Sequence, residues 1–136
     1  MEQTLAIYLA GFIDGEGCFL ATVNKATGGW QITLAIGQSN IEFLQSLQKE
    51  IGFGSIHGKH PHYRLHLYSE QLRNLLPIIL PHLRIKKREA EITLEILEVI
   101  KHRSRRYRDV ATENKIILLA DKLKMEKPCN KFQELI

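Results

Sequence analysis

Apolar residues recur at two different spacings along the chain. A spacing of three or four residues, typical of an amphipathic helix, holds in five segments: 3–15, 39–51, 69–76, 85–102 and 113–125. A spacing of two residues, typical of a half-buried strand, holds in four segments: 17–25, 30–37, 54–59 and 62–68. The turn-forming pairs Gly28-Gly29 and His60-Pro61 would join these strands into two hairpins. The predicted order is an α-ββ-α-ββ-α core followed by two more helices.

Capping residues and a proline set the expected helix ends. Ser39-Asn40-Ile41-Glu42 has the capping-box pattern at the start of the second helix, and Gly52 is placed to end that helix. Pro77 is expected to interrupt the third helix, because proline lacks the backbone N–H that a helix interior uses. Ile85 is expected to begin the apolar stripe of the long fourth helix.

Alternation divides the predicted sheet into an apolar and a polar face. The apolar face carries Phe19, Val23, Ile32, Leu34, Leu65 and Leu67. Amphipathic helices bury their apolar stripes on such a face, so we expect an α+β fold in which the helices cover one side of a four-stranded antiparallel sheet. The opposite face is polar, aromatic and cationic, and an antiparallel sheet can leave such a face uncovered.

The distribution of charge adds to this picture. The chain has 136 residues, which fits a single domain over 1–136, and a formal net charge of +4. Between residues 17 and 69 the carboxylates are Glu42 and Glu50, and both lie in the predicted second helix. The predicted strands therefore carry no negative charge. A solvated face normally mixes both signs, so nucleic acid is the partner that this face favours.

Composition excludes two classes of protein. No apolar run approaches the ~18 residues that a membrane-spanning helix needs. The two cysteines, Cys18 and Cys129, are too few for a disulfide framework and fit a reducing interior. The opening residues Met1-Glu2-Gln3 lack the positive charge of a secretory signal, so we expect an intracellular protein.

The first predicted helix ends in an acidic turn, Asp14-Gly15-Glu16-Gly17. The carbonyls at a helix C-terminus carry partial negative charge, so carboxylates there are locally unfavourable. A bound Mg²⁺ would reverse this, with the Glu16 carboxylate and the Gly15 carbonyl as oxygen ligands. In isolation, a solvated acidic turn is the simpler interpretation.

The stretch Leu9-Ala10-Gly11-Phe12-Ile13-Asp14-Gly15-Glu16-Gly17 resembles the signature of the LAGLIDADG homing endonucleases. The predicted order of elements after this motif is similar to the core of that family. A second stretch, Leu80-Pro81-His82-Leu83-Arg84-Ile85-Lys86-Lys87, resembles the segment that carries the family's active-site lysine. The resemblance covers roughly residues 5–105.

The resemblance implies a role for each matching residue. Glu16 and the carbonyl of Gly15 would bind the metal, and Glu16, Gln38 and Lys86 would be the catalytic residues, with Lys87 as the alternative lysine. Asp14 would be structural. The motif helices of this family pack against each other, which assigns Leu9, Ala10, Gly11 and Phe12 to a dimer interface. Because the chain has one motif, the resemblance implies a homodimer.

The implied enzyme is a site-specific endodeoxyribonuclease, encoded in an intron and acting in intron homing. It would cut both strands of a long, pseudo-palindromic DNA site by Mg²⁺-dependent phosphodiester hydrolysis, with the two sheets forming a saddle over the DNA. Outward positions predicted to read bases are Thr22, Asn24, Gln31, Thr33, His57, Lys59, His62, Arg64 and His66. Positions predicted to contact phosphates are Lys25, His60, Arg103, Arg105, Arg106 and Arg108.

Three alternatives stay open. An intron maturase would use the same cationic surface on folded RNA, a regulator of the same fold would bind DNA without cutting it, and a structural basic protein would have no use for the acidic turn. Members of the family occur in organelles and prokaryotes. The absence of an evident transit peptide fits synthesis in a chloroplast, a mitochondrion or a prokaryotic cytoplasm.

Overall fold

A curved antiparallel sheet forms the centre of the computed structural model, which describes residues 1–24, 26–101 and 109–127. Its four strands lie in the order β1-β2-β4-β3. The strands are β1 (Gly17–Val23), β2 (Trp30–Gln38), β3 (Ser55–Lys59) and β4 (His62–Tyr68). The helices are α1 (Gln3–Glu16), α2 (Ile41–Ile51), α3 (Ser69–Ile79), the 3-10 helix η1 (Leu80–His82), α4 (Lys87–Lys101) and α5 (Val110–Glu126). The predicted α-ββ-α-ββ-α order is confirmed.

The sheet register explains where the core lies. Leu34 of β2 is paired with Phe19 of β1 on one side and with Leu67 of β4 on the other, and all three side chains are fully buried. One row further along, Ile36 is paired with Leu65. Burying each such side chain contributes about 1.5–3 kcal/mol. The alternation that predicted an apolar face therefore describes the layer on which the helices pack.

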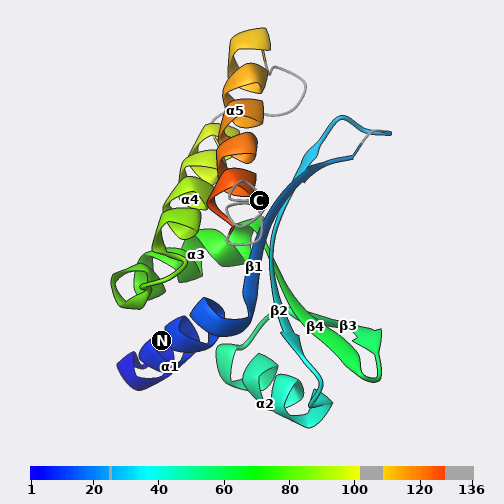
Figure 1. Cartoon of the computed structure of the whole chain (residues 1–136), viewed down its shortest axis with the longest axis vertical. Coiled ribbons are helices and arrows are strands. Elements are labelled where there is room, and N and C mark those ends of the chain that lie inside the picture. The colour runs from blue at the N-terminus through cyan, green and yellow to red at the C-terminus, as the bar shows by residue number, and fades with distance from the viewer. Residues whose placement is uncertain (25, 102–108, 128–136) are drawn as a thin grey trace, which may run out of the picture.

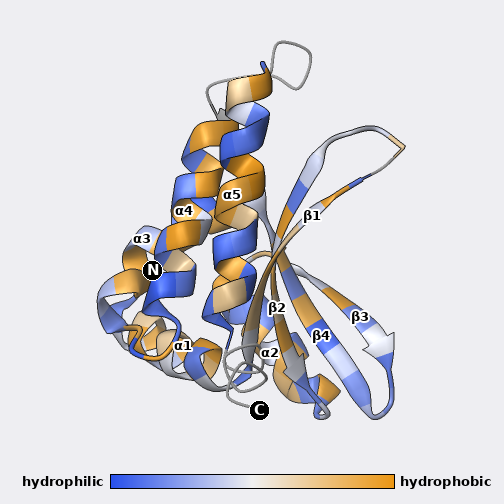
Figure 2. Ribbon diagram, turned by 45° about the horizontal axis from the view of Figure 1, so that its top comes forward, coloured by the Kyte–Doolittle hydropathy of each residue, from blue (hydrophilic) through white to orange (hydrophobic). Residues whose placement is uncertain are grey.

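The helices lie on one side of the sheet, and its concave face is left without a helix over it (Figure 1). Hydrophobic and hydrophilic residues alternate along β4 (Figure 2), as expected for a strand with one covered and one open face. The helices α1, α3 and α4 contribute buried aliphatic residues to a continuous core with the sheet. We refer to the uncovered side below as the open face. No helix in the described ranges is long and apolar enough to cross a membrane.

The end of the third helix differs from the prediction. Pro77 does not interrupt α3, which continues to Ile79 and passes directly into η1. Pro77 lies in the last turn and is exposed, so its ring displaces nothing in the core. Its missing N–H removes one intrahelical hydrogen bond. The Leu80 N–H restores the ladder by donating to the carbonyl of Leu76.

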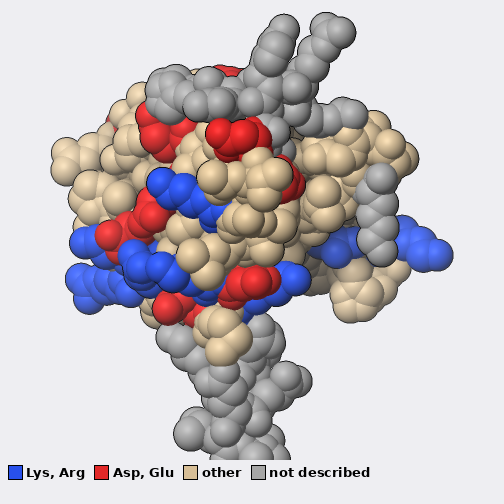
Figure 3. Space-filling model, turned by 90° about the horizontal axis from the view of Figure 1, so that it is seen from above, with Lys and Arg blue, Asp and Glu red and all other residues tan. Residues whose placement is uncertain are grey.

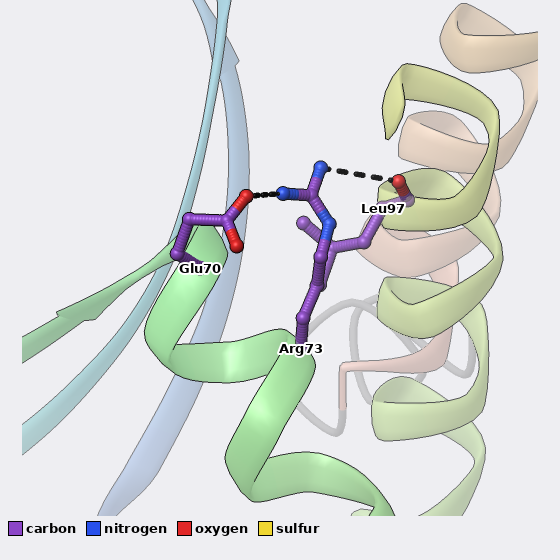
Figure 4. Close-up of polar contacts among 3 residues, drawn as sticks. All are labelled: Glu70, Arg73 and Leu97. Atoms are coloured by element: carbon purple, nitrogen blue, oxygen red, sulfur yellow. Dashed lines mark hydrogen bonds and ion pairs between the residues drawn. The ribbon is translucent and has the colours of Figure 1, made fainter. Parts of the chain in front are cut away.

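One turn before this proline, Arg73 joins α3 to α4 (Figure 4). Its Nη1 pairs with the carboxylate of Glu70, and its Nη2 donates to the main-chain carbonyl of Leu97 at 3.3 Å. The Glu70 side chain is mostly exposed, so the ion pair itself adds little stability. The bond to Leu97 is the part that links the two helices directly.

Three other expectations are wrong in detail. The cap of α2 is Asn40, whose side chain accepts from the Phe43 N–H at 3.0 Å, and not Ser39. Ile85 precedes α4 and is 68% exposed, so it lies outside the apolar stripe of that helix. Val23 is 43% exposed because β1 extends there beyond the helices that cover the rest of its apolar face.

Candidate functional site

The passage from α1 into β1 depends on Gly17. Its N–H donates to the carbonyl of Ile13 and closes the helix. A Cβ at this position would lie 2.8 Å from the Ile13 carbonyl oxygen, which is closer than side-chain atoms can approach. Glycine therefore allows the chain to leave the helix at once, and Glu16 is held at the junction with its side chain exposed.

A groove of about 740 Å³ runs from this junction along the ends of β2 and β4. It is lined by Glu16, Gly37, Gln38, Ser39, Pro61, His62, Tyr63 and Arg64. The structure thus brings together Glu16 and Gln38, two residues that the sequence placed in one site. Tyr63 was missed, although it is paired with Gln38 in the sheet. The pairing of β2 with β4 was the missing information, because periodicity within single strands does not show which residues lie opposite each other.

The side chain of Gln38 is held by the turn that follows it. Its Oε1 accepts from the Ser39 N–H at 2.9 Å, from the Asn40 N–H at 3.2 Å and from the Ser39 hydroxyl at 3.3 Å. The amide oxygen is therefore occupied, and the NH₂ group is the end of Gln38 that can donate to a ligand or a water in the groove.

Asp14 and Lys86 connect α1 to the segment before α4. The Asp14 carboxylate accepts three backbone hydrogen bonds, from Arg84 at 2.9 Å, Ile85 at 3.1 Å and Lys86 at 3.0 Å. The Lys86 ammonium donates back to the main-chain carbonyl of Asp14 at 2.9 Å. The structural role expected for Asp14 is confirmed. Lys86 is not among the residues that line the groove of Glu16.

The open face of the sheet is cationic. Six of the predicted base-reading residues are exposed there: Thr22, Gln31, His57, Lys59, His62 and Arg64. His60, predicted to contact phosphate, is exposed in the turn between β3 and β4. None of the four strands contains a carboxylate. Seen from above, acidic and basic residues lie side by side over the helical part of the molecule, whereas the right-hand side, where the sheet lies, shows Lys or Arg among uncharged residues and no Asp or Glu (Figure 3).

A cluster of rings occupies the open face of β3 and β4. The rings of His57 and His66 lie 4.6 Å apart, and the His66 Nδ1 is 3.3 Å from the Tyr68 hydroxyl. The Ser55 hydroxyl is 2.8 Å from the His57 Nε2. Partial burial lowers the pKa of His66 below its ordinary value, and the nearby His57 and Arg64 lower it further. His66 therefore resists protonation more than a solvated histidine does.

Several predicted site residues are placed differently. Thr33 is only 7% exposed, and it lies between Leu20 and Tyr68 in the sheet. The Asn24 side-chain oxygen accepts from the Ala26 N–H at 3.0 Å and shapes the hairpin turn. Five predicted phosphate contacts lie outside the described residues: Lys25, Arg103, Arg105, Arg106 and Arg108.

The predicted dimer interface also needs correction. Leu9 and Ala10 are fully buried in the core of their own chain, so a second chain cannot contact them. Gly11 is exposed and Phe12 is half-buried, with its ring 5.2 Å from Phe43. The exposed side of α1 instead carries Ile7 and Tyr8, each about half exposed. A helix has one buried and one outward side, and the motif residues are divided between the two.

The oxygen atoms at the end of α1 that could bind a metal form only part of the ligand set of a hard divalent cation. The Glu16 carboxylate is exposed, and the carbonyls of Gly15 and Glu16 lie at a helix end where no further intrahelical N–H is available. Oxygen ligands of this kind suit Mg²⁺, which keeps several waters. Among the described residues, no three His, Cys, Asp or Glu side chains form a metal-binding group. One chain therefore offers a partial set of ligands.

Comparison with known proteins agrees with these features. The sequence model of one family, described as LAGLIDADG endonuclease, matches residues 9–102. The DNA endonuclease I-CreI of Chlamydomonas reinhardtii is 30% identical over 106 residues, which are 71% of this chain and 64% of that relative. The chain thus matches just under two thirds of the relative's length.

Two solved structures are similar in fold. The homing endonuclease I-CvuI, in complex with its target in the presence of 2 mM Ca, has a TM-score of 0.81 at 24% identity, over 93% of this chain and 83% of that chain. An archaeal intron-encoded homing endonuclease, I-Vdi141I, complexed with DNA, has a TM-score of 0.79 at 22% identity, over 93% of this chain and 86% of that chain.

Proposed function

The chain belongs to the LAGLIDADG endonuclease family, and on this premise we propose that it is a homing endonuclease that cuts both strands of a long, pseudo-palindromic DNA site. One observation carries the proposal. The carboxylate-free open face of the sheet ends in the groove that holds Glu16 and Gln38. A surface suited to a polyanion is therefore continuous with a carboxylate suited to a metal ion, as nucleic-acid cleavage requires.

DNA binding is proposed to occur along the open face. A curved β-ribbon can enter the major groove and present alternate side chains to base edges. Arg64 is the strongest candidate for base readout, because it is exposed, lines the groove and can donate two hydrogen bonds to guanine. Gln31 is the corresponding candidate for adenine. The proposed phosphate contacts are Lys25, His60, Arg103, Arg105, Arg106 and Arg108.

Hydrolysis is proposed to take place at the end of α1. Glu16 and the Gly15 carbonyl would hold Mg²⁺, which supplies charge neutralisation at the reacting phosphate and activation of water. The NH₂ group of Gln38 would orient the attacking water, because its amide oxygen is already held by the Ser39 turn. The ammonium of Lys86 would stabilise negative charge that develops on the phosphate.

Two copies of the chain are proposed to form the active enzyme. A Cβ at Gly11 or Gly15 would meet nothing within 4 Å in this chain, so the fold itself does not require glycine at either position. Glycine in a helix costs about 1 kcal/mol relative to alanine. The two glycines are four residues apart and therefore share a helix side, where the backbone of a second α1 could approach. A two-fold axis there would also bring two Glu16 carboxylates together and complete the partial ligand set.

The proposal is tested by incubating the protein and Mg²⁺ with a randomised duplex library and sequencing the cut ends, with EDTA in place of Mg²⁺ as the control. We expect paired cuts on both strands within a long, roughly two-fold-symmetric site. Enrichment of a bound duplex without cuts would instead indicate a DNA-binding regulator. Preferential binding of structured RNA, in competition with every duplex tested, would indicate an intron maturase.

A further inference from the structure

We propose that Asp14 is a positioning residue for Lys86, acting through a pair of reciprocal contacts between α1 and the start of α4. The inference rests on the proposed function, because it assigns Lys86 a place in the reaction. It goes beyond a structural role for Asp14, since it makes the cleavage rate depend on Asp14 through Lys86.

The first contact is the Asp14 carboxylate at the positive end of α4. The carbonyl of Lys86 accepts from the Ala90 N–H at 2.9 Å, so Lys86 is the N-cap residue directly before this helix. The three N–H groups that point at Asp14, those of residues 84–86, belong to the segment that leads into it. Both carboxylate oxygens are used, Oδ2 for Arg84 and Oδ1 for the other two. The backbone of Lys86 is therefore fixed by a side chain from α1.

The second contact is the Lys86 ammonium at the negative end of α1. The carbonyl of Asp14 is one of the last in the helix and has no intrahelical partner there. Lys86 Nζ supplies that partner at 2.9 Å, and a cation at a helix C-terminus is also favoured by the helix dipole. Backbone and side chain of Lys86 are thus both held by one residue of α1.

The consequence concerns Glu16. Only one residue separates Asp14 from Glu16, and both lie in the last turn of α1. Because the helix is rigid over so short a distance, Asp14 sets the position of Lys86 relative to the carboxylate proposed to hold the metal. Rates of well-oriented reactions are sensitive to such placement, and a 1 Å displacement can cost roughly 100-fold.

Asp14→Asn is the informative change. It preserves the size of the side chain and one acceptor oxygen, but it replaces the other oxygen with an NH₂ group that faces an N–H donor. We first expect the Lys86 amine to react faster with an acetylating reagent in this variant, because the backbone of Lys86 is held less firmly. Limited acetylation followed by mass spectrometry would compare half-buried Lys86 with its exposed neighbour Lys87. The ratio of Lys86 to Lys87 labelling should rise in Asp14→Asn, and an unchanged ratio would overturn the inference without any activity measurement.

The second arm is a double-mutant cycle with Lys86→Met. Single-turnover cleavage of the library-selected duplex should slow roughly 10- to 100-fold in Asp14→Asn, while DNA affinity without divalent ions stays the same. In the Lys86→Met background the same change should alter the rate by less than about twofold, because its effect passes through the lysine. Equal losses in both backgrounds would show that Asp14 acts only on the fold.

Asp109→Asn is the matched control. The Asp109 carboxylate likewise accepts a backbone hydrogen bond, and it caps α5 by accepting from the Thr112 N–H at 2.8 Å. This variant should lower thermal stability slightly and leave the cleavage rate and the labelling ratio unchanged. A wild-type protein that cuts no duplex would refute the proposed function and this inference together. Wild-type cleavage with equal losses across the cycle would refute this inference alone.

Discussion

The glycines of the first motif separate two kinds of constraint, and their alanine variants should have effects of opposite sign. A methyl group at Gly11 meets nothing within 4 Å in its own chain, whereas one at Gly17 meets the Ile13 carbonyl oxygen at 2.8 Å. Gly11→Ala should therefore stabilise the isolated chain by about 0.5–1 kcal/mol through helix propensity. Gly17→Ala should destabilise it by about 1–3 kcal/mol, the usual cost of overpacking.

Gly11→Ala should have the opposite effect on self-association and weaken the dimer. If α1 packs against a second α1 at Gly11, the added methyl is present on both sides of the two-fold axis. The dimer should then weaken by at least about 1.4 kcal/mol, a tenfold change in dissociation constant. Sedimentation equilibrium measures that dissociation constant. Urea unfolding at protein concentrations below the dissociation constant measures the stability of the single chain. A Gly11→Ala protein that dimerises as tightly as the wild type would refute the reasoning.

Three other variants test the site and the elements that support it. Arg64→Ala should relax base preference at one symmetric pair of positions in the selected site, since an arginine–guanine contact is worth about 1–3 kcal/mol, and an unchanged preference in a binding selection would contradict the readout role. Asn40→Ala should lower the free energy of unfolding by about 1 kcal/mol in urea titrations, because the α2 cap is lost, and no change would show that the cap bond contributes nothing. The wild-type protein should lose stability as the pH falls below about 6.5, because the pKa of His66 is lowered in the folded chain and the unfolded chain therefore binds the proton first. His66→Gln should reduce this loss of stability. An identical loss between pH 7 and pH 5 in both proteins would contradict the assignment to His66.

The hairpins and the helix order could be predicted because each depends on local spacing. Strand alternation alone identified Phe19, Leu34 and Leu67 as core residues, and all three are fully buried. Pro77 shows where local rules fail, since the proline predicted to interrupt the helix lies inside its last turn, exposed to solvent. Two residues near it, Leu76 and Ile79, are buried in the core, which the local sequence alone does not show.

The residues of the candidate site that lie within one continuous segment of the sequence could be predicted. Glu16 and its neighbours could be identified from the motif, and Gln38 from the family resemblance at the end of the second strand. Thr33 shows the limit of alternation, which assigns a residue to a face but does not show that it is buried there, between Leu20 and Tyr68 of the neighbouring strands. The contact of Asp14 with residues 84–86 joins positions about 70 residues apart, and no periodicity encodes it. Tyr63 was missed for the same reason, because its pairing with Gln38 is long-range.

The most direct test of the central claim is the cleavage of the library-selected duplex by wild-type protein and by Glu16→Gln in the presence of Mg²⁺. Glutamine preserves the size of the side chain and removes the charge that the metal requires. We predict that wild-type protein cuts both strands, and that Glu16→Gln binds the duplex with the same affinity without divalent ions but cuts neither strand. A Glu16→Gln protein that cuts at the wild-type rate would contradict this prediction.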